Sequence, residues 1–499
     1  MSLKSALTYT IQFLLGFSKQ KLIHIIEVLR EQYFELESEN KRLKQENEQY
    51  KAEEEKRKIK LVNQKANQPT SKQPEWELKG VGNDGQGKKK GRGKKGRPGA
   101  GNKKKSSSIT HHETASVERC DNCGADLSGE CVLESKNIRV IEDIPPVQIQ
   151  PLVIEVVQEK KYCQNCKRVV TAQSELALPK SDIGLNTTVR IIYMWISSCL
   201  PFTRLSSYLT TFFGQTISTS GLSAHVIRVA KIMNPVYEEI LDMIKSSGVL
   251  HADETGWRVN GKNWWLWVFG TVDAAYYTID SSRGKDVVRR VLGEIFTGVL
   301  VVDGWRAYMS LFCEQQSCMA HVLRKIRKLH EAFPDLVCVY QYYVKLRKIL
   351  RDGERLQARR LELGEEVFKR RRNKLHQRLD TLQCWENPNN TLQNIIGIVN
   401  RQRPRILTFV DNEGVPCHNN YAEYLIRIGV LKRKVSFGSK SAGGASAYAV
   451  LLSIYTTCKL NDIPFADYML QSLKHYIRFG KPMLIKKYVE QREMLAKAA

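Results

Sequence analysis

The sequence predicts a multidomain α+β protein, and three observations lead to this class. The chain has 499 residues, more than the roughly 250 to 300 at which a single hydrophobic core stops growing. It is 42% hydrophobic and 26% charged, which is ordinary globular usage. A heptad repeat near the N-terminus is followed, in the middle of the chain, by runs of strand character and helical periodicity. We therefore expect several folded parts joined by linkers.

Apolar residues recur every seven positions in the segment 1–65, which predicts a coiled coil. The repeat consists of Leu22, Leu29, Leu36, Leu43 and Tyr50, with Ile26, Tyr33, Asn40 and Asn47 at the intervening seam positions. Asparagines in a seam favour a defined two-stranded pairing, so we expect a homodimer, with a higher oligomer as a further possibility. The alternative is one amphipathic helix packed on its own chain.

A segment rich in glycine and lysine follows at residues 66–110. It has too little apolar surface to offset chain entropy, so we expect it to be disordered when free. The whole chain has 78 Lys and Arg against 52 Asp and Glu, a net charge of +26, which favours nucleic acid as the partner. A solubilising linker and a DNA-binding arm both fit this composition. The candidate phosphate contacts are Lys88, Lys89, Lys90, Arg92, Lys94, Lys95 and Arg97.

Two Cys-x-x-Cys pairs predict a zinc-binding β module at residues 111–180. Four thiolates suit a structural, tetrahedral Zn²⁺, and the pairs are Cys120 with Cys123 and Cys163 with Cys166. The 39 residues between the pairs exceed the usual spacing of about 15 to 20. Twelve cysteines in 499 residues is too low a density for a disulfide framework, and we find no apolar run near the roughly 20 residues of a membrane span. We expect a cytoplasmic protein with no membrane partner.

Residues 181–247 have helical periodicity and are expected to form a helical DNA-binding domain. Val189, Ile192 and Trp195 lie on one apolar stripe. A turn at Phe213-Gly214-Gln215 precedes the capping stretch Ser218-Thr219-Ser220, which resembles the joint of a helix-turn-helix. The alternative is a pair of core helices without a DNA contact.

A strand–strand–strand–helix–strand order begins at residue 248. The expected strands are 248–253, 263–270, 275–279 and 298–302, and the expected helix is 285–296. Asp253 ends the first strand and Asp303 follows the fourth, where carboxylates of adjacent strands can converge on divalent cations. Glu254 should point to the other face, because successive strand residues alternate. This order predicts a ribonuclease H-like core, although a strand-end Asp is often only a turn former.

Four motifs in this region resemble the transposases of the insertion-sequence-66 family. They are His251-Ala252-Asp253-Glu254-Thr255, Asp303-Gly304-Trp305-Arg306-Ala307-Tyr308, Cys318-Met319-Ala320-His321 and Asn419-Asn420-Tyr421-Ala422-Glu423. The resemblance runs from the cysteine pairs to about Leu473. Tyr424 departs from it, because family members usually have Arg after the glutamate.

The resemblance implies an Asp-Asp-Glu polynucleotidyl transferase in which Asp253, Asp303 and Glu423 hold two Mg²⁺ (or Mn²⁺) ions. Two such ions activate a water or a DNA 3′-hydroxyl and neutralise the leaving oxygen. The implied reaction is cleavage of the ends of an insertion sequence and strand transfer into target DNA. The implied setting is the bacterial nucleoid, with accessory proteins of the same element as possible partners.

The 120-residue distance from Asp303 to Glu423 is longer than a compact core needs. We expect a helical insertion at 331–410 between two core segments, 248–330 and 411–475, and a basic tail at 476–499. Further candidate DNA contacts are Arg324, Arg427, Arg433 and Lys434. The alternatives to the enzyme are a non-catalytic, zinc-containing dimeric DNA-binding regulator and a decayed transposase, and the three carboxylates favour the enzyme.

Overall fold

The computed structural model describes residues 19–66, 118–119, 122–128, 151–383 and 390–498. They divide into two compact units. One contains the described parts of 1–79, 158–201 and 223–499, and the other contains those of 80–157 and 202–222. Within the described residues, we find no helix with the length and apolarity that a membrane span needs.

The heptad segment is one continuous helix, α2 (Lys19–Ala66). It contains neither Pro nor Gly, so its backbone hydrogen bonds run without a break. The seam residues Tyr33, Leu36 and Leu43 are 63%, 59% and 47% exposed. The helix is confirmed, whereas its pairing with a second copy remains a prediction. The basic arm from Lys88 to Arg97 lies outside the described residues.

Between residues 151 and 248, two short strands and four helices precede the main sheet. The strands β1 (Lys160–Cys163) and β2 (Arg168–Thr171) pair antiparallel. The helices are α3 (Leu185–Ile196), α4 (Phe202–Phe213), α5 (Thr219–Ile232) and α6 (Asn234–Lys245). The predicted stripe of Val189, Ile192 and Trp195 is buried, and Ser218 Oγ accepts a hydrogen bond from Gly221 N at 3.1 Å at the start of α5. The helical character is confirmed, and DNA reading by these helices remains a prediction.

The main sheet has five strands in the order β5-β4-β3-β6-β7. They are β3 (Val249–Val259), β4 (Lys262–Gly270), β5 (Ala275–Asp280), β6 (Ile295–Val302) and β7 (Phe312–Ser317). The first three are antiparallel neighbours, and β6 and β7 run parallel to β3. Helix α7 (Lys285–Leu292) connects β5 to β6. It ends earlier than expected, because Gly293 adopts φ +84° and stops the helix.

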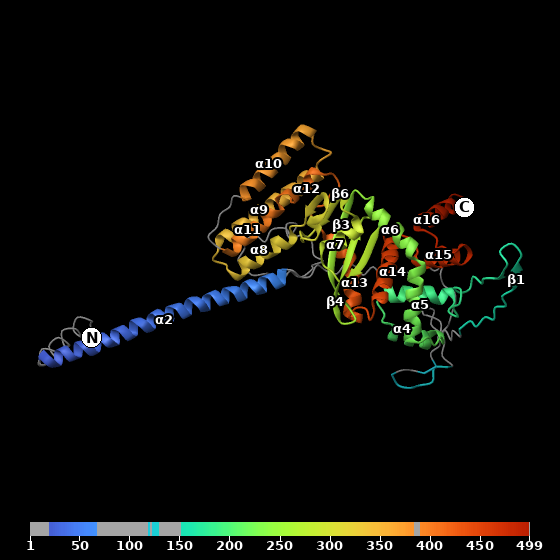
Figure 1. The fold of residues 1–499 in the computed structure, drawn as a ribbon. Coiled ribbons are helices and arrows are strands. Elements are labelled where there is room, and N and C mark those ends of the chain that lie inside the picture. Colours follow the sequence, from blue (N-terminus) through green and yellow to red (C-terminus); the bar gives the residue numbers. More distant parts are fainter. Residues whose placement is uncertain (1–18, 67–117, 120–121, 129–150, 384–389, 499) are drawn as a thin grey trace. The chain divides into compact units, whose positions relative to one another are not determined.

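Two long helices, α13 (Asn420–Ser436) and α14 (Ala442–Leu460), pack against the antiparallel part of the sheet (Figure 1). Tyr277 of β5 donates its hydroxyl to Leu425 O of α13 at 2.8 Å, and its N–H donates to Ser453 of α14 at 2.9 Å. The opposite face carries the short 3₁₀ helix η2 (Tyr308–Ser310), where Tyr308 meets Trp267 edge to face with ring centres 5.9 Å apart. Each face of β3 therefore has its own set of neighbours.

The region between the sheet and α13 is helical, as expected. Its elements are α8 (Ala320–Ala332), α9 (Val337–Ala358), α10 (Glu365–Gln383), α11 (Asn390–Gln402), η3 (Arg403–Arg405) and α12 (Thr408–Asp411). Leu323, Leu346 and Leu379, from three of these helices, are fully buried in one hydrophobic cluster. Since α8 contributes to this cluster, the helical part begins near residue 320.

The C-terminal segment, expected as a basic tail, contains further packed helices. They are α15 (Phe465–Phe479) and α16 (Ile485–Ala498). Tyr488 of α16 is buried and donates its hydroxyl to Asp467 of α15 at 2.5 Å. The segment is thus held by apolar packing and not by charge alone.

Candidate active site

Asp253 and Asp303 are neighbours across two parallel strands. His251 of β3 pairs with Val301 of β6, so extending this register by two residues brings Asp253 opposite Asp303. Residues paired across parallel strands share a face of the sheet. The side chain of Asp303 also accepts a hydrogen bond from Trp305 N at 2.9 Å, which fixes the turn after β6. Asp253 thus lies inside β3, which continues to Val259 and does not end at Asp253 as expected, and it is the neighbour of Asp303 at the C-terminal end of β6.

Glu423 reaches the same place from α13, and Asn419 holds that helix against β3. Asn419 Nδ2 donates to Ala252 O at 2.7 Å, and His251 Nδ1 donates to Asn419 Oδ1 at 3.0 Å. Glu423 lies one turn further, in the first turn of α13. The Asn419 contacts thus hold the start of α13, which carries Glu423, against the strand that carries Asp253.

The carboxylates are close enough to affect one another. The pKa of Asp253 is well above its ordinary range, first because the group is buried and then because Glu254, Asp303 and Glu423 bring further negative charge. His321 of α8 is the nearest base, with Nε2 3.9 Å from Glu423 Oε1. Burial and the neighbouring Arg324 lower the pKa of His321, which favours the neutral imidazole. Asp303 and Glu423 are therefore close enough to oppose the ionisation of Asp253.

Glu254 faces the other side of β3 and has strong partners there. It pairs with Trp267 across β3 and β4, on the face that carries η2. Its Oε1 accepts from Arg283 Nη2 at 2.8 Å and Nε at 3.0 Å, and its Oε2 accepts from the Tyr308 hydroxyl at 2.5 Å. The Glu254 side chain is only 1% exposed. A buried carboxylate with such partners is a structural group.

Two tryptophans enclose Arg283 beside Asp303. The guanidinium carbon lies 4.5 Å from the ring centre of Trp265 and 4.1 Å from that of Trp305. Trp305 Nε1 donates to Arg283 O at 3.2 Å. Between Asp303 and Trp305, Gly304 adopts φ +87°, and a Cβ there would collide with the side chain of Gln402. The conformation after Asp303 thus depends on a glycine and on the Arg283 stack.

The predicted DNA contacts lie in different surroundings. Arg433 Nη1 donates to Thr255 Oγ1 at 3.1 Å and to Gly256 O, so it ties α13 to β3. Arg324 is 6% exposed, and its burial leaves little surface for a phosphate. Arg427 and Lys434 are exposed. A phosphate role for all four residues remains a prediction, with these last two the more accessible.

Sequence reasoning missed Lys432, which lies directly before Arg433. Lys432 is 3% exposed, and its Nζ donates to Trp195 O at 3.1 Å and Leu200 O at 3.0 Å at the end of α3. Burial lowers the pKa of Lys432 to about 8. In a run of basic residues, only the helical phase could have marked it as the inward one.

The described cysteines of the predicted zinc module lie in tight turns. Cys123 follows Arg119, which bridges to Asp126, and Cys163 and Cys166 flank the turn of β1–β2. The residue after each second cysteine has positive φ, +75° at Gly124 and +49° at Lys167. Hydrogen bonds lower the pKa of Cys163. The largest effect comes from the backbone N–H of Cys166 and the next from the Cys166 thiol. Cys120 lies outside the described residues, so the four-sulfur site remains a prediction.

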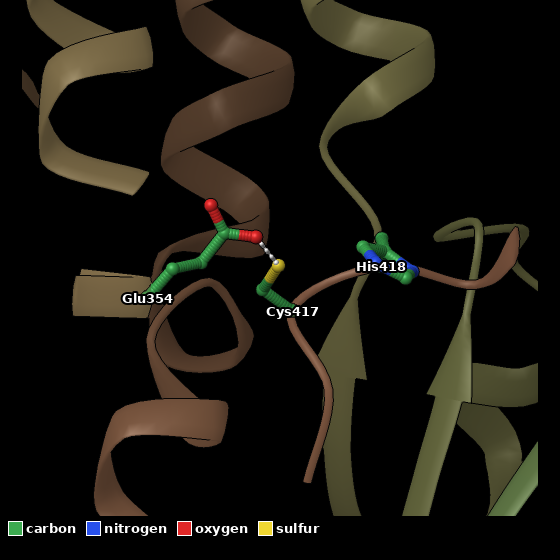
Figure 2. Close-up of side chains that lie close together, drawn as sticks. All are labelled: Glu354, Cys417 and His418. Atoms are coloured by element: carbon green, nitrogen blue, oxygen red, sulfur yellow. Dashed lines mark hydrogen bonds between the residues drawn. The ribbon is translucent and has the colours of Figure 1, made fainter. Parts of the chain in front are cut away.

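A second cluster joins α9 to the segment before α13. Glu354, Cys417 and His418 have ligand atoms within 4.8 Å of one another, the one set of three this compact among the described residues. Figure 2 shows the Cys417 sulfur directed at the Glu354 carboxylate, to which the thiol donates at 2.6 Å. This hydrogen bond joins α9 to the segment that precedes α13.

Comparison with known proteins gives a family and several relatives. The model described as "Transposase IS66 family" matches residues 180–447, more than half of the chain. The uncharacterized protein y4qI of Sinorhizobium fredii (strain NGR234) is 25% identical over 334 residues, which are 58% of this chain and 60% of that protein. The uncharacterized protein y4hP of the same organism is 25% identical over 385 residues, 69% of this chain and 68% of that protein.

Proposed function

The chain belongs to the IS66 family of transposases, a family of DNA-processing enzymes, and from this premise we propose that it is an Asp-Asp-Glu enzyme that cuts and joins the ends of an insertion sequence. The observation that carries the proposal is that Asp253, Asp303 and Glu423 lie close together where α13 packs on the C-terminal end of the β3–β6 pair. The strand order β5-β4-β3-β6-β7, with β4 alone between antiparallel partners, supports a ribonuclease H-like core.

The residues fit a pair of hard divalent cations, Mg²⁺ or Mn²⁺. Burial and then acidic neighbours raise the pKa of Asp253; a bound cation would offset the charge of those neighbours, and carboxylate oxygens are the ligands such ions prefer. We propose Asp253, Asp303 and Glu423 as the metal ligands. The ions, when bound, would activate the attacking hydroxyl and stabilise the leaving oxygen of a phosphodiester.

The protein's own contribution is to hold these ligands in place. Asn419 and His251 anchor the turn that carries Glu423 to the strand that carries Asp253. The Glu254–Arg283–Tyr308 network holds the opposite face of the same strand, one residue after Asp253. Ligands that are already held in place lower the free-energy cost of rearrangement during the reaction, so we assign these groups as positioning residues.

The test is cleavage of DNA that carries the ends of the protein's own element. Purified full-length protein with Mg²⁺ or Mn²⁺ should produce 3′-hydroxyl nicks at the element boundary. A decayed transposase or a DNA-binding regulator would bind these ends without nicking them, and that result would overturn the proposal.

We also propose that the cysteine turns hold one structural Zn²⁺ and that α2 pairs with a second copy. Metal analysis should return one zinc per chain, lost in the Cys163→Ser and Cys166→Ser variants; a folded, zinc-free protein would argue against it. The exposed seam residues Tyr33, Leu36 and Leu43 support a parallel dimer. A peptide of residues 18–60 that sediments as a monomer at tens of micromolar, roughly where such zippers pair, would refute pairing.

A further inference from the structure

A basic groove runs between α9 and α10 of the helical insertion. It has a volume of about 400 Å³, and its walls and floor are formed by Asp352, Arg355, Leu356, Arg359, Leu363, Arg371, Lys374, Leu375 and Arg378. Five of these residues are cations and one is an anion. Leu356 and Leu375 on the floor are only 6% and 4% exposed, because they belong to the hydrophobic cluster of the insertion. The groove is therefore a rigid basic surface on a packed core.

Most of this positive charge is not neutralised within the groove. Arg378 pairs with Asp352 at 2.8 Å, and Arg359 pairs with Glu362 at 2.9 Å. Arg355, Arg371 and Lys374 are exposed, and no acidic partner is found for them among the described residues. Like charges held this close repel one another, so the arrangement costs stability unless an anion occupies the groove.

The α10 wall has the length of a short stretch of nucleic-acid backbone. Arg371, Lys374 and Arg378 are three and then four residues apart, so they lie on one face of the helix. They span about 10 Å along it, which corresponds to roughly three phosphates of one DNA strand. The facing wall is formed by Arg355 of α9 and by Arg359, the residue directly after the end of α9. Because the five cations are spread along both walls, they can contact several phosphates of one strand, whereas a single small anion would reach only some of them.

The other side of α9 contacts the segment that leads to Glu423. Gln357 Nε2 donates to Val415 O at 2.7 Å, and the Cys417 thiol donates to Glu354 at 2.6 Å (Figure 2). A Cβ at Gly353 would lie 2.7 Å from Phe409 Cζ, so this turn of α9 approaches α12 closely. One stretch of α9 thus carries the groove cations on one side and the support of α13 on the other.

We propose that the α9–α10 groove binds the phosphate backbone of the DNA substrate through Arg355, Arg371 and Lys374. The inference rests on the proposed function, because it takes the substrate to be DNA, and it adds a second DNA-binding surface outside the carboxylate cluster. A DNA strand bound in the groove would contact α9, the same helix that supports the segment before α13. The groove is expected to act on all DNA sequences alike, since it offers cations to phosphates and not donors to base edges.

The test compares two triple variants of the full-length chain. The groove variant is Arg355→Gln, Arg371→Gln, Lys374→Gln, and the control is Lys348→Gln, Lys369→Gln, Arg370→Gln. Both remove three exposed cations from α9 and α10, but the control residues do not line the groove. Affinity for a duplex of random sequence is measured in EDTA over a range of salt concentrations, and thermal melting checks that both variants are folded.

The groove variant should bind roughly tenfold to a hundredfold more weakly at physiological salt, and its slope of log affinity against log salt should fall by about 2 to 3, the value for three lost phosphate contacts. The control should change both quantities much less. Equal losses in the two variants would overturn the proposal, because only net charge would then matter. Since the binding assay contains no divalent metal, its result does not depend on cleavage. Failure of the wild type to nick its own element ends in the separate Mg²⁺ assay would overturn the proposed enzyme and leave the groove result unchanged.

Discussion

Asp253 and Glu254 are adjacent on β3, yet their side chains lie in opposite electrostatic surroundings. Asp253 faces α13, and its pKa is raised first by burial and then by the charges of Glu254, Asp303 and Glu423. Glu254 faces η2, where burial and Asp303 raise its pKa but the contacts of Tyr308 and Arg283 counter the increase. The difference distinguishes two uses of a buried acid. Glu254 is held by the side chains of Arg283 and Tyr308, whereas Asp253 accepts the backbone N–H of Glu254 at 2.9 Å and is the one we propose as a metal ligand.

The largest effect is expected from removing a carboxylate on the α13 side. Asp253→Asn, Asp303→Asn or Glu423→Gln removes a negative metal ligand at nearly constant shape. Cleavage should fall by more than about a hundredfold, beyond the usual cost of losing an outer-shell contact, while DNA binding persists. Nicking assays and binding isotherms check this, and a variant with full cleavage would remove its residue from the ligand set.

A smaller loss is expected from Asn419→Ala. Without Asn419, the His251 and Ala252 contacts disappear and Glu423 is no longer held at a fixed distance from Asp253. We expect cleavage to fall roughly tenfold to a hundredfold, with the loss in kcat more than in KM for DNA. Asn419→Asp, which keeps an acceptor for His251, should restore part of the rate. A purely structural role would instead lower thermal stability without changing the rate of the folded enzyme.

Glu254→Gln should change stability more than catalysis. The substitution leaves Arg283 without its charged partner and weakens the Tyr308 contact. Because the Arg283 side chain is 36% exposed, water screens part of the cost, and we expect a loss of about 1 to 3 kcal/mol. Denaturant unfolding measures this loss. Should Glu254→Gln match Asp253→Asn in abolishing cleavage, the assignment of the two faces would be reversed.

His225 provides a third case, a buried base with a neutral partner. It is 6% exposed and shares a 2.8 Å hydrogen bond with Thr188, and burial, followed by Arg228, lowers its pKa to about 4. Between pH 6.5 and 4 the unfolded chain binds the proton and the folded chain does not, so stability falls as the pH falls. We expect a contribution of about 1 kcal/mol between pH 7 and 5.5. Urea unfolding measures the free energy of unfolding at the two pH values. In His225→Gln, the difference between these two free energies should be smaller by this amount.

The sequence allowed the central strands and the aspartates to be predicted, because Val301 and Val302 precede Asp303 in an apolar run and alternation separates Asp253 from Glu254. Strand β7 was missed since its buried residues are polar. Gln316 is fully buried, and its Nε2 donates to Ile406 O at 3.1 Å while its Oε1 accepts from Phe409 N at 2.8 Å. Such a glutamine becomes a core residue only through partners some 90 residues away.

The partners of the site residues were equally hidden in the sequence. Arg283 lies 29 residues from Glu254, and no periodicity connects them. The DNA contact expected of Arg433 remains a prediction, and nothing in the sequence indicated that this side chain donates to Thr255 of β3. Charge and residue type can be read from a sequence, whereas the direction of a side chain depends on packing.

The most direct test of the proposed metal site is to measure Mn²⁺ binding by variants of Asp253 and Glu254, which lie on opposite faces of β3. Mn²⁺ bound to the full-length protein can be counted by electron paramagnetic resonance in the absence of DNA. Wild type and Glu254→Gln should both bind Mn²⁺, and Asp253→Asn should lose most of it, with a higher melting temperature in metal-free buffer because one of several repelling charges is gone. If Asp253→Asn binds Mn²⁺ as tightly as the wild type, the cluster of Asp253, Asp303 and Glu423 is not a metal site.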